Sequence, residues 1–412
     1  MRAGRAQRLA ARIGIDDLPL DDTRFRRIFA AEALSLLGSR IAPVALVFAA
    51  LEVSGAAGVG LVLAARQIPM VALLIGGGVI ADRRSPKSLM IAADVARAAA
   101  QGATALVLIL GHAELWHLIA LQAAYGAAEA FSPPAQAGLI ADVVPAERLQ
   151  AANSLRAFAE SIAGIAGPAL AGVLVVAVGP GWGLAADGAT FAASALVLAF
   201  VSMTARPTVA GRRFVADLRD GWRAFRSSDW LWGGVATMSL WNCVYGVYLV
   251  LGPVVADEER GGAATWAAIG TAAGIGAVAG GLLLVRLRPR RPGVLFTAGL
   301  LCACGPALTL ATGLPLAVVI ASAVVSGAGA IGFNATWEST VQREVPRESL
   351  SRVIAYDWFG SLSLGPVGFV IGGLLAEPLG ATNVLLGAGI GLVLLPMLLW
   401  AIPGVRALRA GL

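Results

Sequence analysis

VPAERLQAANSLRAF, residues 144–158, recurs in diluted form as VPRESLSRVIAYDWF, residues 345–359. At the same spacing, three glycines of the first stretch's continuation align with three of the second: Gly164 with Gly365, Gly167 with Gly368 and Gly172 with Gly373. The spacing is close to half of the 412-residue chain, which indicates a tandem duplication. We therefore expect two similar units, each about 200 residues long.

The composition places both units in a membrane. Hydrophobic residues make up 58% of the chain and charged residues 14%, whereas soluble domains average about half and about a quarter. Glycine is abundant, at 51 residues, as expected where membrane helices pack closely without a hydrophobic force between them. Two similar membrane bundles facing one another are typical of secondary transporters.

Twelve apolar runs have roughly the length that a helix needs to cross a bilayer. They lie at about 28–51, 57–81, 89–111, 115–138, 152–177, 182–203, 230–255, 266–285, 294–312, 315–338, 353–376 and 382–401. The prediction is an all-α integral membrane protein with twelve transmembrane helices in two pseudo-symmetric six-helix bundles.

These runs divide the chain into five parts. We expect a cytoplasmic extension at 1–27, a first bundle at 28–203, a linker at 204–229, a second bundle at 230–402 and a cytoplasmic tail at 403–412. The linker contains FVADLRDGWRAF, which places Phe214, Leu218, Trp222 and Phe225 on one helical face. This pattern predicts an interfacial helix on the cytoplasmic leaflet.

The arginines predict the orientation. With a cytoplasmic N-terminus, the termini and cytoplasmic connections hold 26 of the 31 Lys and Arg residues, while the opposite face holds only Arg260. By the positive-inside rule, both termini of a multi-pass protein of the inner membrane are expected in the cytoplasm. The net charge of +6 is then an orientation signal. No nucleic-acid-binding motif accompanies it, so we expect a lipid bilayer and no nucleic acid as its surroundings.

The connection after the second run reads GVIADRRSPK, residues 78–87. It resembles the loop signature of the major facilitator superfamily, Gly-x-Leu-Ala-Asp-Arg-x-Gly-Arg-Arg. Gly78, Asp82, Arg83 and Lys87 match, while Ser85 and Pro86 depart from the pattern. The resemblance implies that this segment, with Asp94 and Arg97 nearby, forms a conformational gate.

The fifth run contains Gly164-x-x-Gly167-Pro168-x-x-x-Gly172. It resembles the Gly-Pro motif of antiporters in the same superfamily. The surrounding sequence looks most like the enterobactin-exporter and macrolide-efflux branch. Many proton-coupled members carry an arginine in the fourth helix, where this chain has Gln122, so Arg40 and Arg66 are the available substitutes.

Charges inside a bilayer are costly and mark functional candidates. Asp94 and Arg97 are three residues apart, and Arg156 and Glu160 are four apart, so each couple is expected to form an ion pair on its own helix. A proton site at Asp94 is the alternative.

Arg40 and Arg66 have no carboxylate close in sequence and are candidates for a substrate cavity. Glu129 is the leading candidate for proton coupling, because a carboxylate in an apolar cavity can bind and release protons. An ion pair with Arg40 or Arg156 is its alternative. Asp94 and Glu338 are the other coupling candidates, Asp187 is weaker, and Glu32 is expected among the lipid headgroups.

Aromatic and amide side chains of the seventh and tenth runs form a possible wall for a large amphipathic ligand. The candidates are Trp241, Asn242, Tyr245, Asn334 and Trp337, with packing as an equally good interpretation of each. Gln122 is a further cavity candidate.

The chain has one lysine, Lys87, and it follows a proline, which excludes a Gly-Lys-Ser/Thr nucleotide loop. No enzyme motif, cofactor site or metal-ligand pattern is present in the sequence. The leading hypothesis is a proton-coupled antiporter, functional as a monomer, that exports an amphipathic small molecule: a drug, a siderophore or another secondary metabolite. The alternatives are an uptake permease, a lysolipid flippase, and a non-transporting component of a membrane complex.

Overall fold

The computed structural model describes residues 19–83, 85–202, 214–286, 291–346 and 348–409. Most of the predicted N-terminal extension, residues 204–213 of the predicted linker and the last three residues of the predicted tail lie outside this part. Within it, every regular element is a helix.

The first half of the molecule contains six α-helices and two short 3-10 helices. They are η2 (Pro19–Asp21), α2 (Thr23–Arg83), α3 (Pro86–Ile109), α4 (Leu115–Glu129), α5 (Ser132–Val143), η3 (Ala146–Arg148), α6 (Leu149–Val178) and α7 (Pro180–Ala199).

A separate helix, α8 (Phe214–Arg226), precedes the second half. The second half consists of α9 (Asp229–Glu259), α10 (Gly262–Arg286), α11 (Pro292–Cys302), α12 (Gly305–Ala311), α13 (Leu316–Glu344), α14 (Leu350–Leu362), α15 (Gly365–Leu379), α16 (Ala381–Ala401) and α17 (Pro403–Ala407).

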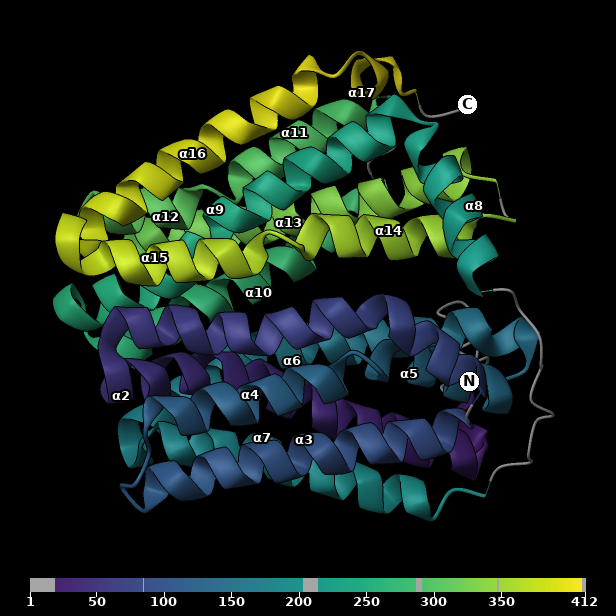
Figure 1. Ribbon diagram of the computed structural model, residues 1–412, viewed down its shortest axis with the longest axis horizontal. Helices are drawn as coiled ribbons and strands as arrows, with labels where there is room; N and C mark the ends of the chain where they lie inside the picture. Colours follow the sequence, from purple (N-terminus) through teal and green to yellow (C-terminus); the bar gives the residue numbers. More distant parts are fainter. Residues whose placement is uncertain (1–18, 84, 203–213, 287–290, 347, 410–412) are drawn as a thin grey trace, which may run out of the picture.

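The two halves lie side by side as two groups of roughly parallel helices (Figure 1). Helix α8 crosses one end of the molecule beside α14, and we name this the linker end. Phe225 of α8 is buried and its ring lies 5.9 Å from that of Tyr356 on α14. The predicted amphipathic helix therefore forms, and one of its apolar residues packs against protein.

Ten segments of the described chain are long and apolar enough to cross a membrane. The first, Thr23–Leu74, contains a bend with non-helical backbone at Ser54 and Gly55. The predicted fourth run, 115–138, is divided between α4 and α5, each shorter than a span. The all-α membrane fold is confirmed, while the number twelve stays a prediction.

The turns opposite the linker end share one feature, and we name that end the hairpin end. They hold all the glycines with positive φ in the described chain: Gly55, Gly111, Gly179, Gly261, Gly262, Gly313 and Gly380. At Gly55, φ is 62° and ψ is −162°, a region that only glycine adopts without strain. Glycine thus lets the first long helix reverse direction within about two residues.

Glycines also set the distance between helices inside one half. A Cβ at Gly327 of α13 would collide with the backbone of Ala273 on α10, and a Cβ at Gly276 would collide with the backbone of Val324. The two helices therefore touch backbone to backbone, which is the close packing that small residues allow in membranes.

The two halves meet along two seams. Helix α6 lies against α10, where a Cβ at Gly274 would be 2.5 Å from the carbonyl oxygen of Gly164. The second part of α2 lies against α15, where a Cβ at Gly373 would be 2.7 Å from the carbonyl oxygen of Ala56. The ion pairs between described residues each lie within one half.

The seams are closed near the hairpin end and separate toward the linker end. Ala56 and Gly373 lie close in sequence to the hairpin glycines Gly55 and Gly380. On the same face of α6, one turn toward the linker end, the side chain of Glu160 is 57% exposed. Along α10, a Cβ at Gly281 would meet no described atom within 4 Å.

The outer surface is apolar. Leu106, Val173, Leu196, Leu374 and Leu394 each expose more than half of their area. Such a surface would associate in water, and it is the surface that contacts lipid in a membrane bundle.

We expect Gly327→Ala to lower the free energy of unfolding by about 1–3 kcal/mol, because an added methyl group overpacks the contact with α10. The matched control is Gly332→Ala on the same helix, where a Cβ would meet no described atom within 4 Å. The control should be neutral or slightly stabilising, since alanine favours helix. Thermal unfolding in detergent measures both, and equal melting temperatures would contradict the packing.

Candidate functional site

An arginine of α2 and a glutamate of α4 form a bidentate ion pair. Arg66 Nε donates to Glu129 Oε2 at 3.1 Å, and Arg66 Nη2 donates to Glu129 Oε1 at 3.0 Å. The guanidinium carbon lies 4.3 Å from the ring centroid of Tyr125. Bidentate arginine–carboxylate pairs are among the strongest and most directional polar contacts.

Arg66, which has no carboxylate close in sequence, thus pairs with one on another helix. The alternative pairing of Glu129 with Arg40 or Arg156 is wrong. The cause lies in helix packing. A Cβ at Gly126 would collide with the backbone of Arg66, so α4 approaches α2 closely at this point. Glu129, almost one turn further along α4, then reaches the guanidinium.

Glu129 is also the last residue of α4. Ala130 and Phe131 separate α4 from α5, which begins at Ser132 and carries prolines in its first turn. A helix that is interrupted inside the membrane is a recurrent feature of transporter binding sites. The ion pair thus lies at a helix break.

The predicted pair on α3 is confirmed. Arg97 Nη2 donates to Asp94 Oδ1 at 2.5 Å, and Ser194 Oγ on α7 donates to Asp94 Oδ2 at 2.6 Å. The Arg97 guanidinium lies 4.0 Å from the ring centroid of Phe191. Both charged side chains are buried, so this pair fixes α3 against α7.

A separate chain of hydrogen bonds joins α4, α3 and α7. Gln122 Nε2 on α4 donates to Gln101 Oε1 on α3 at 2.9 Å, and Gln101 Nε2 donates to Asp187 Oδ2 on α7 at 2.7 Å. Gln101, Gln122 and Asp187 are fully buried. Asp187, the weaker coupling candidate of the sequence, is thus a buried carboxylate that accepts the last hydrogen bond of this chain.

Two further ion pairs join the first part of α2 to α6. Arg156 Nε donates to Glu32 Oε1 at 2.6 Å, and Arg40 Nη2 donates to Glu160 Oε1 at 2.8 Å. The predicted pair between Arg156 and Glu160 is wrong, because α2 offers each of them an opposite charge across the helix contact. Glu32 is buried rather than among headgroups.

The pair of Arg40 and Glu160 differs from the others in exposure. The two side chains expose 47% and 57% of their area, although both helices carry them within segments long enough to span a membrane. Exposed charges at such positions face water rather than lipid. This pair is therefore the part of the first half most open to a polar ligand.

The loop motif is only partly described. The side chains of Gly78, Asp82 and Arg83 lie outside the described residues, so their predicted role as a gate stays a prediction. Lys87 Nζ donates to the carbonyl oxygens of Ala199 at 3.1 Å and Val201 at 2.7 Å. A cation at the carboxyl end of α7 is favoured by the helix dipole.

The Gly-Pro motif lies in contact with both α2 and α10. A Cβ at Gly167 would collide with Arg40 on α2, while Gly164 and Pro168 face Gly274 and Gly270 on α10. A Cβ at Gly172 would be 2.5 Å from Cβ of Ala267 on α10. The motif therefore packs the seam between the halves.

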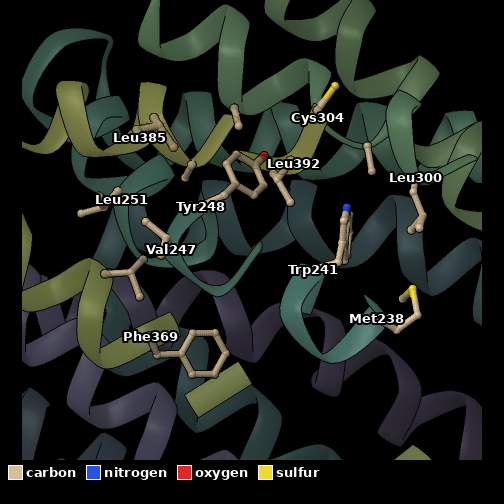
Figure 2. Packing of buried hydrophobic residues seen from close by; sticks show 14 of the residues in the cluster. Met238, Trp241, Val247, Tyr248, Leu251, Leu300, Cys304, Phe369, Leu385 and Leu392 are labelled. Carbon is tan, nitrogen blue, oxygen red and sulfur yellow. The ribbon is translucent and has the colours of Figure 1, made fainter. Parts of the chain in front are cut away.

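In the second half, the predicted ligand wall divides into buried and accessible members. Trp241 is 7% exposed and lies in the apolar core with Met238, Leu300 and Cys304 (Figure 2). Its ring stacks on Tyr245 at 4.7 Å between centroids, while Nε1 has no hydrogen-bond partner among described residues. Packing is thus the principal role of the Trp241 ring.

The remaining members lie in two different environments. Asn242 Nδ2 donates to the carbonyl oxygen of Ser361 at 3.0 Å, and Trp337 Nε1 donates to Asp357 Oδ2 at 2.9 Å. Asn334 and Glu338 are exposed on one face of α13, and Glu338 accepts a hydrogen bond from Gln342.

Asp357 is a buried carboxylate that the sequence patterns did not bring out. Asp357 lies in the repeated stretch, where residues 356–359 read YDWF and the aligned residues 155–158 read LRAF. The change from arginine to aspartate between the two copies is the sequence feature that could have pointed to Asp357. No group of three or more His, Cys, Asp or Glu residues suited to a metal occurs in the described chain.

Comparisons with known proteins agree with this architecture. The chain matches the family of transmembrane secretion effectors over residues 18–409. Macrolide efflux protein A of Streptococcus pyogenes is 24% identical over 383 residues, which cover 89% of this chain and 92% of that protein. An uncharacterized MFS-type transporter, YvqJ of Bacillus subtilis (strain 168), is 25% identical over 346 residues, which cover 82% of this chain and 82% of that protein.

Solved transporter structures share the fold at low identity. An auto-inhibited POT family peptide transporter has a TM-score of 0.77 at 12% identity, over 95% of this chain and 98% of that chain. The nucleoside transporter NupG has a TM-score of 0.71 at 16% identity, over 92% and 99%. The chain is therefore a transporter and not an enzyme, and it belongs to the major facilitator superfamily, in its family of transmembrane secretion effectors.

Proposed function

We propose that the protein exports amphipathic small molecules in exchange for protons, by alternating access between its two halves. The export direction and substrate class are supported by the match to macrolide efflux protein A along nearly the whole chain. The orientation that we propose, with both termini in the cytoplasm, makes the linker end the cytoplasmic end.

The observation that carries proton coupling is the pair of Arg66 and Glu129 at the break between α4 and α5. Proton binding to Glu129 would neutralise the carboxylate and leave Arg66 without its partner. An unpaired arginine in an apolar region is unstable, so α2 and α4 would rearrange or Arg66 would bind an anionic group. Asp94 is less suited to coupling, since Arg97 and Ser194 hold it between α3 and α7.

The seams support alternating access. Glycines and small apolar side chains form them. Among the described residues, Gln67 Nε2 donates a hydrogen bond across the halves to the carbonyl oxygen of Leu362, at 3.0 Å. Opening such a seam separates van der Waals contacts and one hydrogen bond, without exposing an unpaired charge. A seam of this kind can close and open at low cost.

A ligand entering from the linker end would meet the exposed pair of Arg40 and Glu160. In this proposal Arg40 and Arg66 provide the polar contacts of the substrate, and Tyr245, Asn242 and Asn334 contribute from the other half. A single chain carries all of these groups, so the protein would function as a monomer.

In proteoliposomes with an imposed pH gradient, we expect macrolides or other amphipathic drugs to drive proton flux through the wild-type protein. Glu129→Gln should reduce this flux at least tenfold, because the amide cannot carry the proton. The matched control is Glu348→Gln, an exposed carboxylate beyond α13, which should keep the wild-type rate.

Flux retained in Glu129→Gln would reject Glu129 and move coupling to Asp94 or Glu338. Flux absent with every compound would contradict proton antiport. Faster entry of a compound or a lysolipid into cells that express the protein would instead favour uptake or lipid flipping.

If the protein works by alternating access, a covalent link between α2 and α15 across their closed contact should stop transport. Cα of Ala57 lies 3.0 Å from the position that a Cβ at Gly373 would take. In a background with the three native cysteines replaced, oxidation of Ala57→Cys/Gly373→Cys should abolish drug transport, and a reductant should restore it. The single Gly373→Cys variant controls for the oxidant, and undiminished transport by the cross-linked protein would contradict the mechanism.

A further inference from the structure

The second half contains a buried carboxylate that the proposed coupling does not use. Asp357 on α14 is 9% exposed. In the duplication it aligns with Arg156 of the first half, so the two copies carry opposite charges at one position. Arg156 has a carboxylate partner, Glu32 on α2.

Asp357 has no such compensation. Trp337 Nε1 donates to its Oδ2 at 2.9 Å, and Ser361 Oγ donates to its Oδ1 at 3.4 Å. None of the ion pairs between described residues includes it. In the first half, Glu32, Asp94 and Glu129 each have an arginine partner. Asp187 has none among the described residues, and its Oδ2 accepts a hydrogen bond from Gln101.

The side chain of Trp337, which donates to Asp357, packs among apolar groups of α9 and α11. Its ring lies against Gly234, where a Cβ would collide with it. The ring also lies 5.6 Å from that of Trp230 and 5.2 Å from that of Phe296, between centroids. Neutral hydrogen bonds alone leave most of the cost of burying an ionised carboxylate uncompensated.

The backbone beside Asp357 is interrupted. Helix α14 ends at Leu362 and α15 begins at Gly365. The carbonyl oxygens at this break accept hydrogen bonds from both halves, Ser361 from Asn242 on α9 and Leu362 from Gln67 on α2. Asp357 therefore lies about one turn from a break at the contact between the halves, which is where transporters place their substrates.

The residues that follow Asp357 in sequence are less buried than Asp357 itself. Ser361 and Ser363 are only partly buried, and Trp358 is 58% exposed. An approaching amphipathic molecule would meet hydroxyl groups, aromatic rings and one carboxylate. A cation with aromatic or apolar surface fits this chemistry, since aromatic faces and a buried carboxylate both attract it.

We propose that Asp357 binds the cationic amine nitrogen of the molecule that the protein exports, in the place of the arginine partners found in the first half. This inference rests on the proposed export function and names its substrate class, cationic amphipathic amines. Trp337 and Ser361 are positioning residues that orient the two carboxylate oxygens.

Two fluorescent probes that differ in charge test the proposal. Dansylcadaverine carries a primary amine at the end of a five-carbon chain, and dansylamide has the same dansyl group without the chain or the charge. Fluorescence anisotropy of each probe is titrated with the full-length protein in lipid nanodiscs at constant pH. The variants are Asp357→Asn, Asp357→Glu and, as a matched control, Glu377→Gln, an exposed carboxylate on α15.

We expect the wild-type protein to bind dansylcadaverine more tightly than dansylamide. Asp357→Asn should weaken dansylcadaverine at least tenfold while leaving dansylamide unchanged, which also shows that the variant is folded. Asp357→Glu and Glu377→Gln should retain the preference for the amine.

Three results would overturn the proposal: equal binding of dansylcadaverine by wild type and Asp357→Asn, no preference of the wild type for the amine, or an equal loss of both probes in Asp357→Asn. Failure of export is a separate outcome. It would appear as absent flux in proteoliposomes while the amine preference at Asp357 persists, whereas failure of this inference leaves flux intact and the preference independent of Asp357.

Discussion

The cost of placing a charge in hydrocarbon governs the structure of the first half. A charged side chain at the centre of a bilayer costs at least about 2.5–3.5 kcal/mol when it has no compensation. Arg66 with Glu129, Arg97 with Asp94, and Arg156 with Glu32 satisfy this requirement in pairs. The first and last of these pairs join two different helices, and Asp94 of the second also accepts a hydrogen bond from Ser194 on α7. The contacts that compensate the charges are therefore also contacts that hold the helices together.

The contact between the halves follows a different principle. It contains glycines and small side chains, as at Gly172 beside Ala267 and Gly373 beside Ala56, and its backbones approach closely. Membrane helices attract one another mainly through such packing. Strong polar interactions are thus kept inside a half, and weak interactions that can be remade lie between the halves, as a molecule that alternates between two states requires.

The asymmetry of the duplication is the clearest trace of function. The two copies share three aligned glycines, since helix packing makes the same demand on both, but they differ in charge within the repeated stretch. The aligned positions Arg156 and Asp357 have opposite signs, and the N-terminal copy contains the buried chain of Gln122, Gln101 and Asp187. In the proposed mechanism, the first half would bind the coupling proton and the second half would bind the cationic part of the substrate.

The contacts of the charged residues could be foreseen only where partners are near in sequence. Asp94 and Arg97, three residues apart on one helix, were paired correctly. Arg156 was assigned to Glu160 because nothing in the chain indicates that Glu32 lies closer in space. Asp187 and Asp357 were undervalued, since burial and partners of a single carboxylate depend on how several helices pack.

The sequence by itself determined the membrane fold, the two related halves and the family, because composition, apolar run length and repeated motifs are local properties of the chain. The tertiary structure alone decided which arginine meets which carboxylate, where helices break, and which face of each half meets the other. Those features arise from distances between helices, which glycines such as Gly126 and Gly167 set only when the partner helix is in place. A bilayer accepts many apolar sequences, but a buried charge is costly there unless packing brings a compensating partner within reach.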